Sequence, residues 1–100
     1  MAKLIKVFWR DIPAQVIAKE RRDTFKVPLT ERFADAIDRA AMRAGKGSSD
    51  AYLEEWKRVT SGCGDDLEGE ATRIAAELEA DYDDDRLKAL VRNKGFEPEA

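Results

Sequence analysis

The chain has 100 residues, of which 43% are hydrophobic and 39% are charged, and its formal net charge is −3. This length predicts one domain, and the hydrophobic fraction favours a folded core over a disordered chain. The charge is uneven, because residues 1–50 hold eleven Lys/Arg and seven Asp/Glu, whereas residues 51–100 hold seven and fourteen. An acidic chain of this kind argues against general nucleic-acid binding, which needs a basic surface.

A single cysteine, Cys63, excludes an internal disulfide and favours a reducing compartment. No segment approaches the roughly 18–20 apolar residues of a membrane span, and the first residues do not resemble a signal peptide. We therefore expect a soluble, cytoplasmic protein that does not contact the membrane. Residues 1–96 are expected to form one globular domain, and residues 97–100 a C-terminal tail.

The first predicted strand covers residues 3–10, where side chains alternate between two faces. One face is fully apolar and is expected to meet the core: Ile5, Val7 and Trp9. The other face is mixed and is expected to stay partly open to water: Leu4, Lys6, Phe8 and Arg10. Pro13 then interrupts the run and favours a turn.

Two further strands are predicted, at residues 14–20 and residues 24–27. For residues 14–20 a helix is the competing interpretation, because Ala, Gln, Lys and Glu are good helix formers. Only about two helical turns would fit between Pro13 and the charged turn, so a strand is preferred. The three strands together predict an antiparallel meander.

After Thr30 the hydrophobic period becomes helical. A first helix is predicted from a Thr30 cap to Gly45, and a second from a cap at Ser48 or Ser49. The apolar stripe of the second helix is Tyr52, Leu53, Trp56 and Val59. A third helix begins after Asp65 and Asp66 and carries the stripe Leu67, Ala71, Ile74, Ala75, Leu78 and Tyr82. A last helix begins at Asp83 or Asp84 and ends at Gly95. The predicted fold is therefore α+β, with a three-stranded antiparallel sheet packed on one face by three to four helices.

The chain lacks the side chains on which most catalytic and metal sites depend. It contains no histidine, the commonest general base and metal ligand. Cys63 precedes a predicted helix, which lowers a thiol pKa, but Asp65 and Asp66 beside it act in the opposite direction. Asp81, Asp83 and Asp85 match the start of a calcium loop, but glycine and glutamate are missing at the later positions that such a loop requires. No catalytic residue, metal or cofactor is therefore predicted.

A partner-binding surface is the remaining interpretation. Phe8 and Arg10 form an exposed aromatic and basic pair on the mixed strand face, of the kind that anchors protein interfaces. A charged turn follows the second strand, and the densest basic patch lies around it: Lys19, Arg21, Arg22 and Lys26. The candidate partner-binding residues are Lys6, Phe8, Arg10, Lys19, Arg21 and Arg22. RNA stacking on this surface is conceivable, but the chain has no recognised RNA-binding motif.

Four segments, "VFWRDIPAQVIAK", "ERFADAIDRAAMRAG", "DAYLEEWKR" and "CGDDLE", resemble a small bacterial domain family labelled "virulence factor". The similarity runs from about Lys3 to Leu90, and the first two segments are the most distinctive. Some relatives carry the domain ahead of helical repeats. Others are stand-alone chains of alphaproteobacteria that accompany corrinoid- or folate-linked methyl-transfer proteins. The resemblance implies a cytosolic accessory protein and brings no catalytic residues with it.

The leading hypothesis is a non-enzymatic, protein-binding accessory module of a bacterial cytosolic complex, associated with virulence. One alternative is an accessory component of a corrinoid- or folate-dependent methyl-transfer system, which follows from the resemblance alone. A second alternative is a small regulator that binds RNA. The identity of the partner and the oligomeric state are left open.

Overall fold

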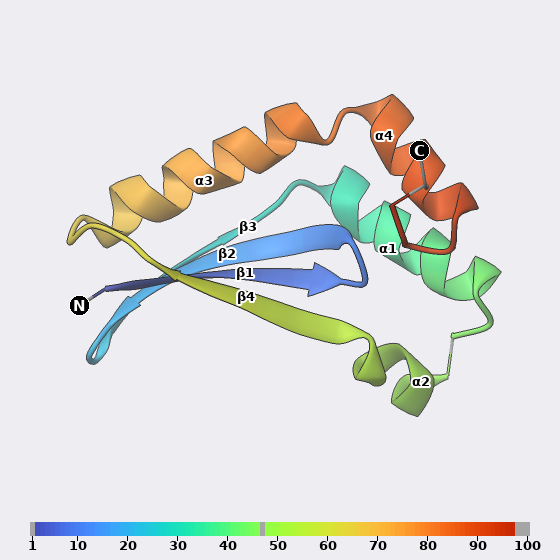
Figure 1. Cartoon of the computed structure of the whole chain (residues 1–100), viewed down its shortest axis with the longest axis horizontal. Coiled ribbons are helices and arrows are strands. Elements are labelled where there is room, and N and C mark those ends of the chain that lie inside the picture. The colour runs from blue at the N-terminus through green and yellow to red at the C-terminus, as the bar shows by residue number, and fades with distance from the viewer. Residues whose placement is uncertain (1, 47, 98–100) are drawn as a thin grey trace.

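The computed structural model describes residues 2–46 and 48–97, and Figure 1 shows the arrangement of its helices and strands. The strands are β1 (Lys3–Trp9), β2 (Ile12–Glu20), β3 (Asp23–Pro28) and β4 (Trp56–Gly62). The helices are α1 (Glu31–Arg43), α2 (Ser49–Glu54), α3 (Leu67–Asp81) and α4 (Asp84–Arg92). The predicted α+β class and the antiparallel sheet are confirmed.

The strands form one antiparallel sheet in the order β3-β2-β1-β4, so the prediction of three strands is wrong. β1 pairs with β2 on one side and with β4 on the other. The β1–β2 register shifts by one residue between Val7 and Phe8: Val7 pairs with Gln15, and Phe8 pairs with Pro13. The extra residue, Ala14, forms a bulge that bends β2 near the end of the sheet.

β4 occupies the residues predicted to continue the second helix. Helix α2 ends at Glu54, and Trp56 then pairs with Trp9 of β1. The ring of Tyr52 stacks on Trp9 at a centroid distance of 5.9 Å and meets Trp56 edge-on at 5.7 Å. The indole Nε1 of Trp9 also donates a hydrogen bond to the Tyr52 carbonyl, at 2.9 Å. Pairing with a distant strand therefore overrides the local helical spacing.

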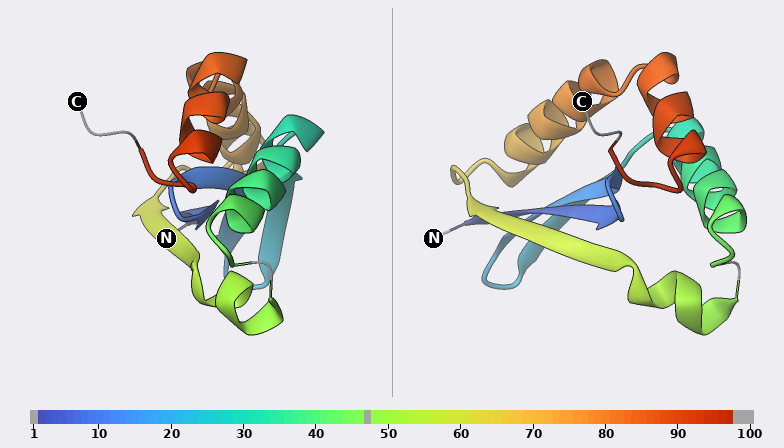
Figure 2. Two further views of the ribbon diagram at one scale, coloured as in Figure 1. Left: turned by 90° about the vertical axis from the view of Figure 1, so that its right-hand side faces the viewer. Right: turned by 45° about the vertical axis from the view of Figure 1, so that its right-hand side comes forward.

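A first group of buried residues, which we call the face core, lies between α3 and one face of the sheet. Its members are Leu4, Val16, Ala18, Ala71, Ala75 and Leu78. The three α3 residues recur at the predicted helical spacing, and the two alanines allow the helix to approach the strands closely. Figure 2 shows α3 lying along this side of the sheet.

A second group, the end core, lies where α1 and α4 meet the end of the β1–β2 hairpin. Its members are Trp9, Ile12, Phe33, Ala36, Ile37, Ala40, Ala41, Leu87 and Leu90. Leu29 and Tyr82 pack against both cores and connect them.

The predicted facing of β1 is wrong. Leu4 was expected on the partly open face, but it is buried beneath α3. Side chains alternate along a strand, so Ile5 and Val7 lie on the face turned away from α3. Trp9 is buried as predicted, because the end core and Tyr52 cover it. The choice of covered face therefore depends on where α3 packs, which the alternation alone does not determine.

Two glycines follow helices at the positions that the sequence predicts, whereas the first residue of the predicted C-terminal tail is bonded to the fold. Gly45 and Gly95 have positive φ angles of 73° and 94°, as expected for residues that end α1 and α4. Glu97, predicted to begin the tail, donates its backbone N–H to Asp11 at 2.8 Å. Residues 98–100 of the predicted tail lie outside the described residues. Within the described chain, no helix has the length and apolar character needed to cross a membrane.

Candidate functional site

The face of the sheet turned away from α3, which we call the open sheet face, is the candidate site. The register defines its members, because residues paired across strands share a face. They are Lys3, Ile5 and Val7 of β1, Gln15, Ile17 and Lys19 of β2, Thr24 and Lys26 of β3, and Arg58 and Thr60 of β4. Figure 2 shows that no helix of the described chain runs along this side of the sheet.

The charge of the open sheet face is positive. Each of the four strands contributes one exposed cation: Lys3, Lys19, Lys26 and Arg58. None of its positions is occupied by Asp or Glu. In the part of the chain that the structure describes, none of the four cations takes part in an ion pair. This concentration of unpaired positive charge is notable in a chain whose net charge is −3.

The centre of the open sheet face is apolar. Val7 and Ile17 are buried among neighbouring side chains, and Ile5 is half-buried. Beside them, Lys3, Ile5, Lys19, Arg21 and Thr60 line a shallow pocket of about 270 Å³. An apolar centre surrounded by cations is suited to a partner surface that combines apolar and acidic groups.

At its other end the open sheet face meets an aromatic pocket of about 200 Å³. Pro28, Tyr52 and Trp56 are among its lining residues, and Asp38 lies at the same pocket. Burial, together with the nearby charge of Asp38, raises the pKa of the Tyr52 hydroxyl above its ordinary value. The phenol therefore stays neutral at physiological pH and can serve as a hydrogen-bonding group for a partner.

The structure separates the predicted partner-binding residues into three groups. Lys19 and Arg21 lie together at the pocket of the open sheet face, and Arg22 is exposed in the same β2–β3 turn. Lys6 and Phe8 lie on the opposite face, beside the region covered by α3, and are half-buried. The side-chain nitrogen of Lys57 lies 5.9 Å from the centre of the Phe8 ring.

Arg10 forms the third group, and its predicted exposure is wrong. Its side chain is only 8% exposed, and Nη2 pairs with Glu55 at 3.0 Å. Nη1 donates a hydrogen bond to the Lys94 carbonyl at 2.7 Å. The guanidinium also lies 5.1 Å from the Trp9 ring centre and 4.4 Å from that of Phe96. Arg10 therefore holds the first hairpin to the C-terminal segment and cannot serve as an exposed anchor.

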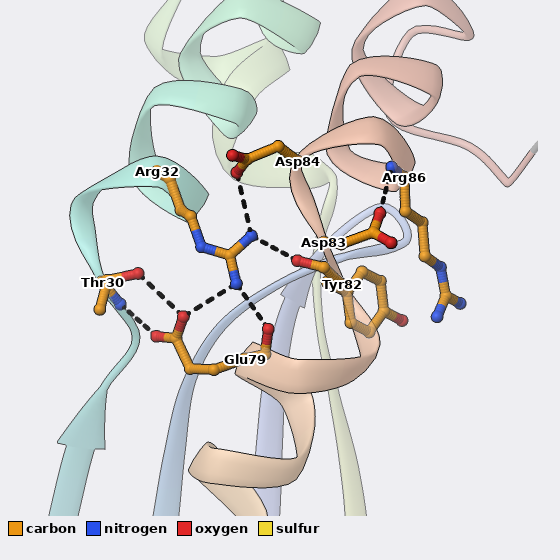
Figure 3. A network of polar contacts seen from close by, with 7 residues as sticks. All are labelled: Thr30, Arg32, Glu79, Tyr82, Asp83, Asp84 and Arg86. Atoms are coloured by element: carbon orange, nitrogen blue, oxygen red, sulfur yellow. Dashed lines mark hydrogen bonds and ion pairs between the residues drawn. The ribbon is translucent and has the colours of Figure 1, made fainter.

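A dense polar network lies at the junction of α1 with the C-terminal end of α3 (Figure 3). Glu79 accepts hydrogen bonds from the backbone and hydroxyl of Thr30, at 2.7 and 2.9 Å. Arg32 pairs with Glu79 at 3.1 Å and also donates to the carbonyls of Glu79 and Tyr82. These bonds connect elements that are far apart in the sequence, so the network has a structural role.

The structure also explains the two remaining candidates from the sequence, Cys63 and Asp83, without a catalytic or metal-binding role. Burial and the nearby Glu70, Glu20 and Asp65 raise the pKa of the Cys63 thiol, which disfavours the reactive thiolate. Asp83, which sequence reasoning weighed as a calcium ligand, caps α4 by accepting a hydrogen bond from the Arg86 backbone at 2.8 Å. The described residues contain no cluster of three or more potential metal ligands.

Sequence reasoning missed Lys3 and Arg58 as members of the basic surface. Lys3 could have been found, because it alternates with Ile5 and Val7 on one face of the predicted first strand. Arg58 could not have been found in this way, because residues 52–59 were predicted to be helical.

A family model described as "Virulence factor" matches residues 7–91. No curated protein and no solved structure matches the chain.

Proposed function

The chain belongs to the virulence factor family, and we propose that it is a non-enzymatic accessory module of a bacterial cytosolic complex. In this proposal it binds an acidic protein partner through the open sheet face. The observation that carries the proposal is the set of four cations, one from each strand, that surround an apolar centre and have no ion pair within the described residues. Such a surface attracts a partner of opposite charge. Ile5, which is half-buried between the cations, is the apolar side chain that a partner could still cover.

A binding role also agrees with the state of the titratable groups. Burial alone would raise the pKa values of Asp11 and Glu79, but hydrogen bonds and cations lower them below their ordinary values. Both carboxylates are occupied by bonds within the fold, and the raised pKa of Cys63 disfavours a nucleophilic thiolate. These features support binding over general acid–base or nucleophilic chemistry.

The proposal can be tested by affinity purification of tagged chains from the native bacterium, with quantitative mass spectrometry. The test variant is Lys26→Glu/Arg58→Glu, which reverses two cations of the open sheet face. The matched control is Arg39→Glu/Arg92→Glu, which makes the same change of charge on the exposed side of α1 and α4. We expect the wild type and the control to retain an acidic protein partner, and the test variant to recover at least tenfold less.

Increasing salt should also weaken recovery of the partner, because exposed charges are screened. Equal recovery by the test variant and the wild type would contradict the proposal, and so would equal loss in both double variants. Recovery of RNA that disappears after ribonuclease treatment, without an acidic protein, would support the RNA-binding alternative instead.

A further inference from the structure

A groove of about 340 Å³ lies along α1 and α4, away from the open sheet face. Each helix contributes a stripe at helical spacing: Arg32, Asp35, Ala36 and Arg39 from α1, and Asp84, Leu87, Lys88, Val91 and Arg92 from α4. Ala36 and Leu87 are buried and Val91 is half-buried, so the floor of the groove is apolar. We call this feature the α1–α4 groove.

The two ends of the groove differ in charge. Arg32 pairs with Asp84 at 3.4 Å and with Glu79 at 3.1 Å, so carboxylates neutralise the cation at this end. The two helices run in roughly the same direction (Figures 1 and 2). Arg39 and Arg92 come later in their helices than Arg32 and Asp84 and line the same groove, so they lie toward its other end. Over the described residues, neither of these arginines nor Lys88 forms an ion pair. Among the described residues that line the groove, three cations without an ion pair therefore stand beside one remaining carboxylate, Asp35.

We propose that the α1–α4 groove binds a small amphipathic anion, a carboxylate or phosphate attached to a short apolar body. The anionic group would be held by Arg39 and Arg92, whose guanidinium groups suit both carboxylate and phosphate. The apolar body would cover Ala36, Leu87 and Val91. This site is separate from the open sheet face and does not depend on the function proposed for that face.

The size of the groove fits this class of ligand. Its volume lies in the lower part of the range of about 300–1,000 Å³ that is usual for small-molecule sites. From Arg32 to Arg39 the helix rises by about 10 Å, which leaves room for a short chain or one ring beside the charged end. The pairs that Arg32 forms also fix one wall of the groove before any ligand binds.

The test is an NMR titration of the ¹⁵N-labelled chain with two probes, octanoate and phenyl phosphate. Their neutral counterparts, octanol and phenol, serve as controls for binding by the apolar body alone. We expect saturable shifts of backbone amides centred on residues 35–39 and 87–92, at probe concentrations up to the millimolar range. The stronger of the two probes identifies which of the two combinations of anionic group and apolar body the groove prefers.

The variant Arg39→Glu/Arg92→Glu should weaken probe binding at least tenfold, whereas Lys26→Glu/Arg58→Glu should leave it unchanged. Both variants alter exposed side chains, and circular dichroism would verify that they fold. Absence of saturable shifts in the groove would overturn the proposal. Equal binding of the neutral counterparts, or unchanged binding by the groove variant, would do the same. None of these results bears on the partner of the open sheet face.

Discussion

The guanidinium of Arg10 stabilises the fold by holding the C-terminal segment against the first hairpin. Arg10 adopts a positive φ of 54° in the turn between β1 and β2, and its side chain is buried beside Trp9 and Phe96. Its Nε atom has no hydrogen-bond partner among the described residues, so burial of the charge is only partly compensated. The pair with Glu55 and the bond to the Lys94 carbonyl provide the compensation that is present.

Replacing Arg10 should therefore destabilise the protein, because its side chain contacts Trp9, Glu55 and the segment from Lys94 to Phe96. We expect Arg10→Met to lower the free energy of unfolding by about 2–4 kcal/mol. Glu55 would lose its shorter ion pair and keep the longer one with Lys46 at 3.9 Å, and the Lys94 carbonyl would lose the Arg10 donor. Urea denaturation followed by circular dichroism measures this change. The control Arg22→Met alters an exposed turn residue and should stay within about 0.5 kcal/mol of the wild type. A loss below about 1 kcal/mol for Arg10→Met would show that the buried charge contributes little.

Glu79 gives a second prediction at the residue scale, on the pH dependence of stability. Burial tends to raise the pKa of its carboxyl, but the bonds from Thr30 and Arg32 lower it below its ordinary value. The folded state therefore favours the ionised form. This contribution is complete well above the ordinary glutamate pKa of about 4.3, and it is lost as the pH falls through the lowered folded pKa.

We expect Glu79→Gln to lower the free energy of unfolding by about 1–2 kcal/mol at neutral pH. The difference from the wild type should shrink as the pH falls below about 4, because the wild-type carboxyl then becomes protonated. Urea midpoints across this pH range measure the effect. Glu77→Gln is the matched control, since Glu77 is exposed and its ion pair within the described residues is with Arg73 on the same helix. A difference that does not vary with pH would show that the charge of Glu79 is unimportant.

At the scale of the elements, those with a local signal could be predicted from the sequence. The alternation of β1, the position of Gly45 after α1 and the acidic caps of α3 and α4 all depend on residues close together in the chain. β4 could not be predicted, because its stability comes from pairing residues 56–62 with residues 3–9. The stripe from Tyr52 to Val59 has helical spacing, which is the stronger local signal.

The same limit applies to the candidate site. Lys19 and Arg21 belong to the predicted basic patch, and both line one pocket because a short turn keeps them close. Arg10 was placed on the surface because alternation was extended past Trp9, where the chain enters a turn and the strand ends. The open sheet face depends on the packing of α3 against the opposite face, which is a property of the tertiary structure.

The exposure of β4 leads to a prediction about its dynamics. Six of its seven residues are exposed, and its ladder with β1 is its main connection to the fold. We expect β4 amide hydrogens bonded to β1 to exchange at least tenfold faster than those in the β1–β2 ladder, because a strand with few buried contacts opens more easily. Hydrogen exchange followed by NMR measures these rates. Equal protection of the two ladders would show that β4 opens only when the whole domain unfolds.

At the scale of the whole molecule, the face core and the end core meet at one junction. Leu29 and Tyr82 pack against both, and the bonds between Thr30, Arg32 and Glu79 lie at the same place. A junction with both apolar and polar contacts should couple the face core to the end core. The domain is therefore expected to unfold as one cooperative unit, as most small domains do.

The two tryptophans allow this coupling to be measured. Trp9 belongs to the end core and Trp56 packs against it, so tryptophan fluorescence reports on the end core. Leu78 belongs to the face core, and Leu78→Ala leaves a cavity there that should lower the free energy of unfolding by about 2–4 kcal/mol. If the cores are coupled, this substitution must shift the urea midpoint of tryptophan fluorescence as far as that of circular dichroism. Leu90→Ala, a change of the same size inside the end core, is the matched control and should shift both signals. A fluorescence midpoint that stays at the wild-type value in Leu78→Ala, while circular dichroism moves, would mean that the cores unfold independently.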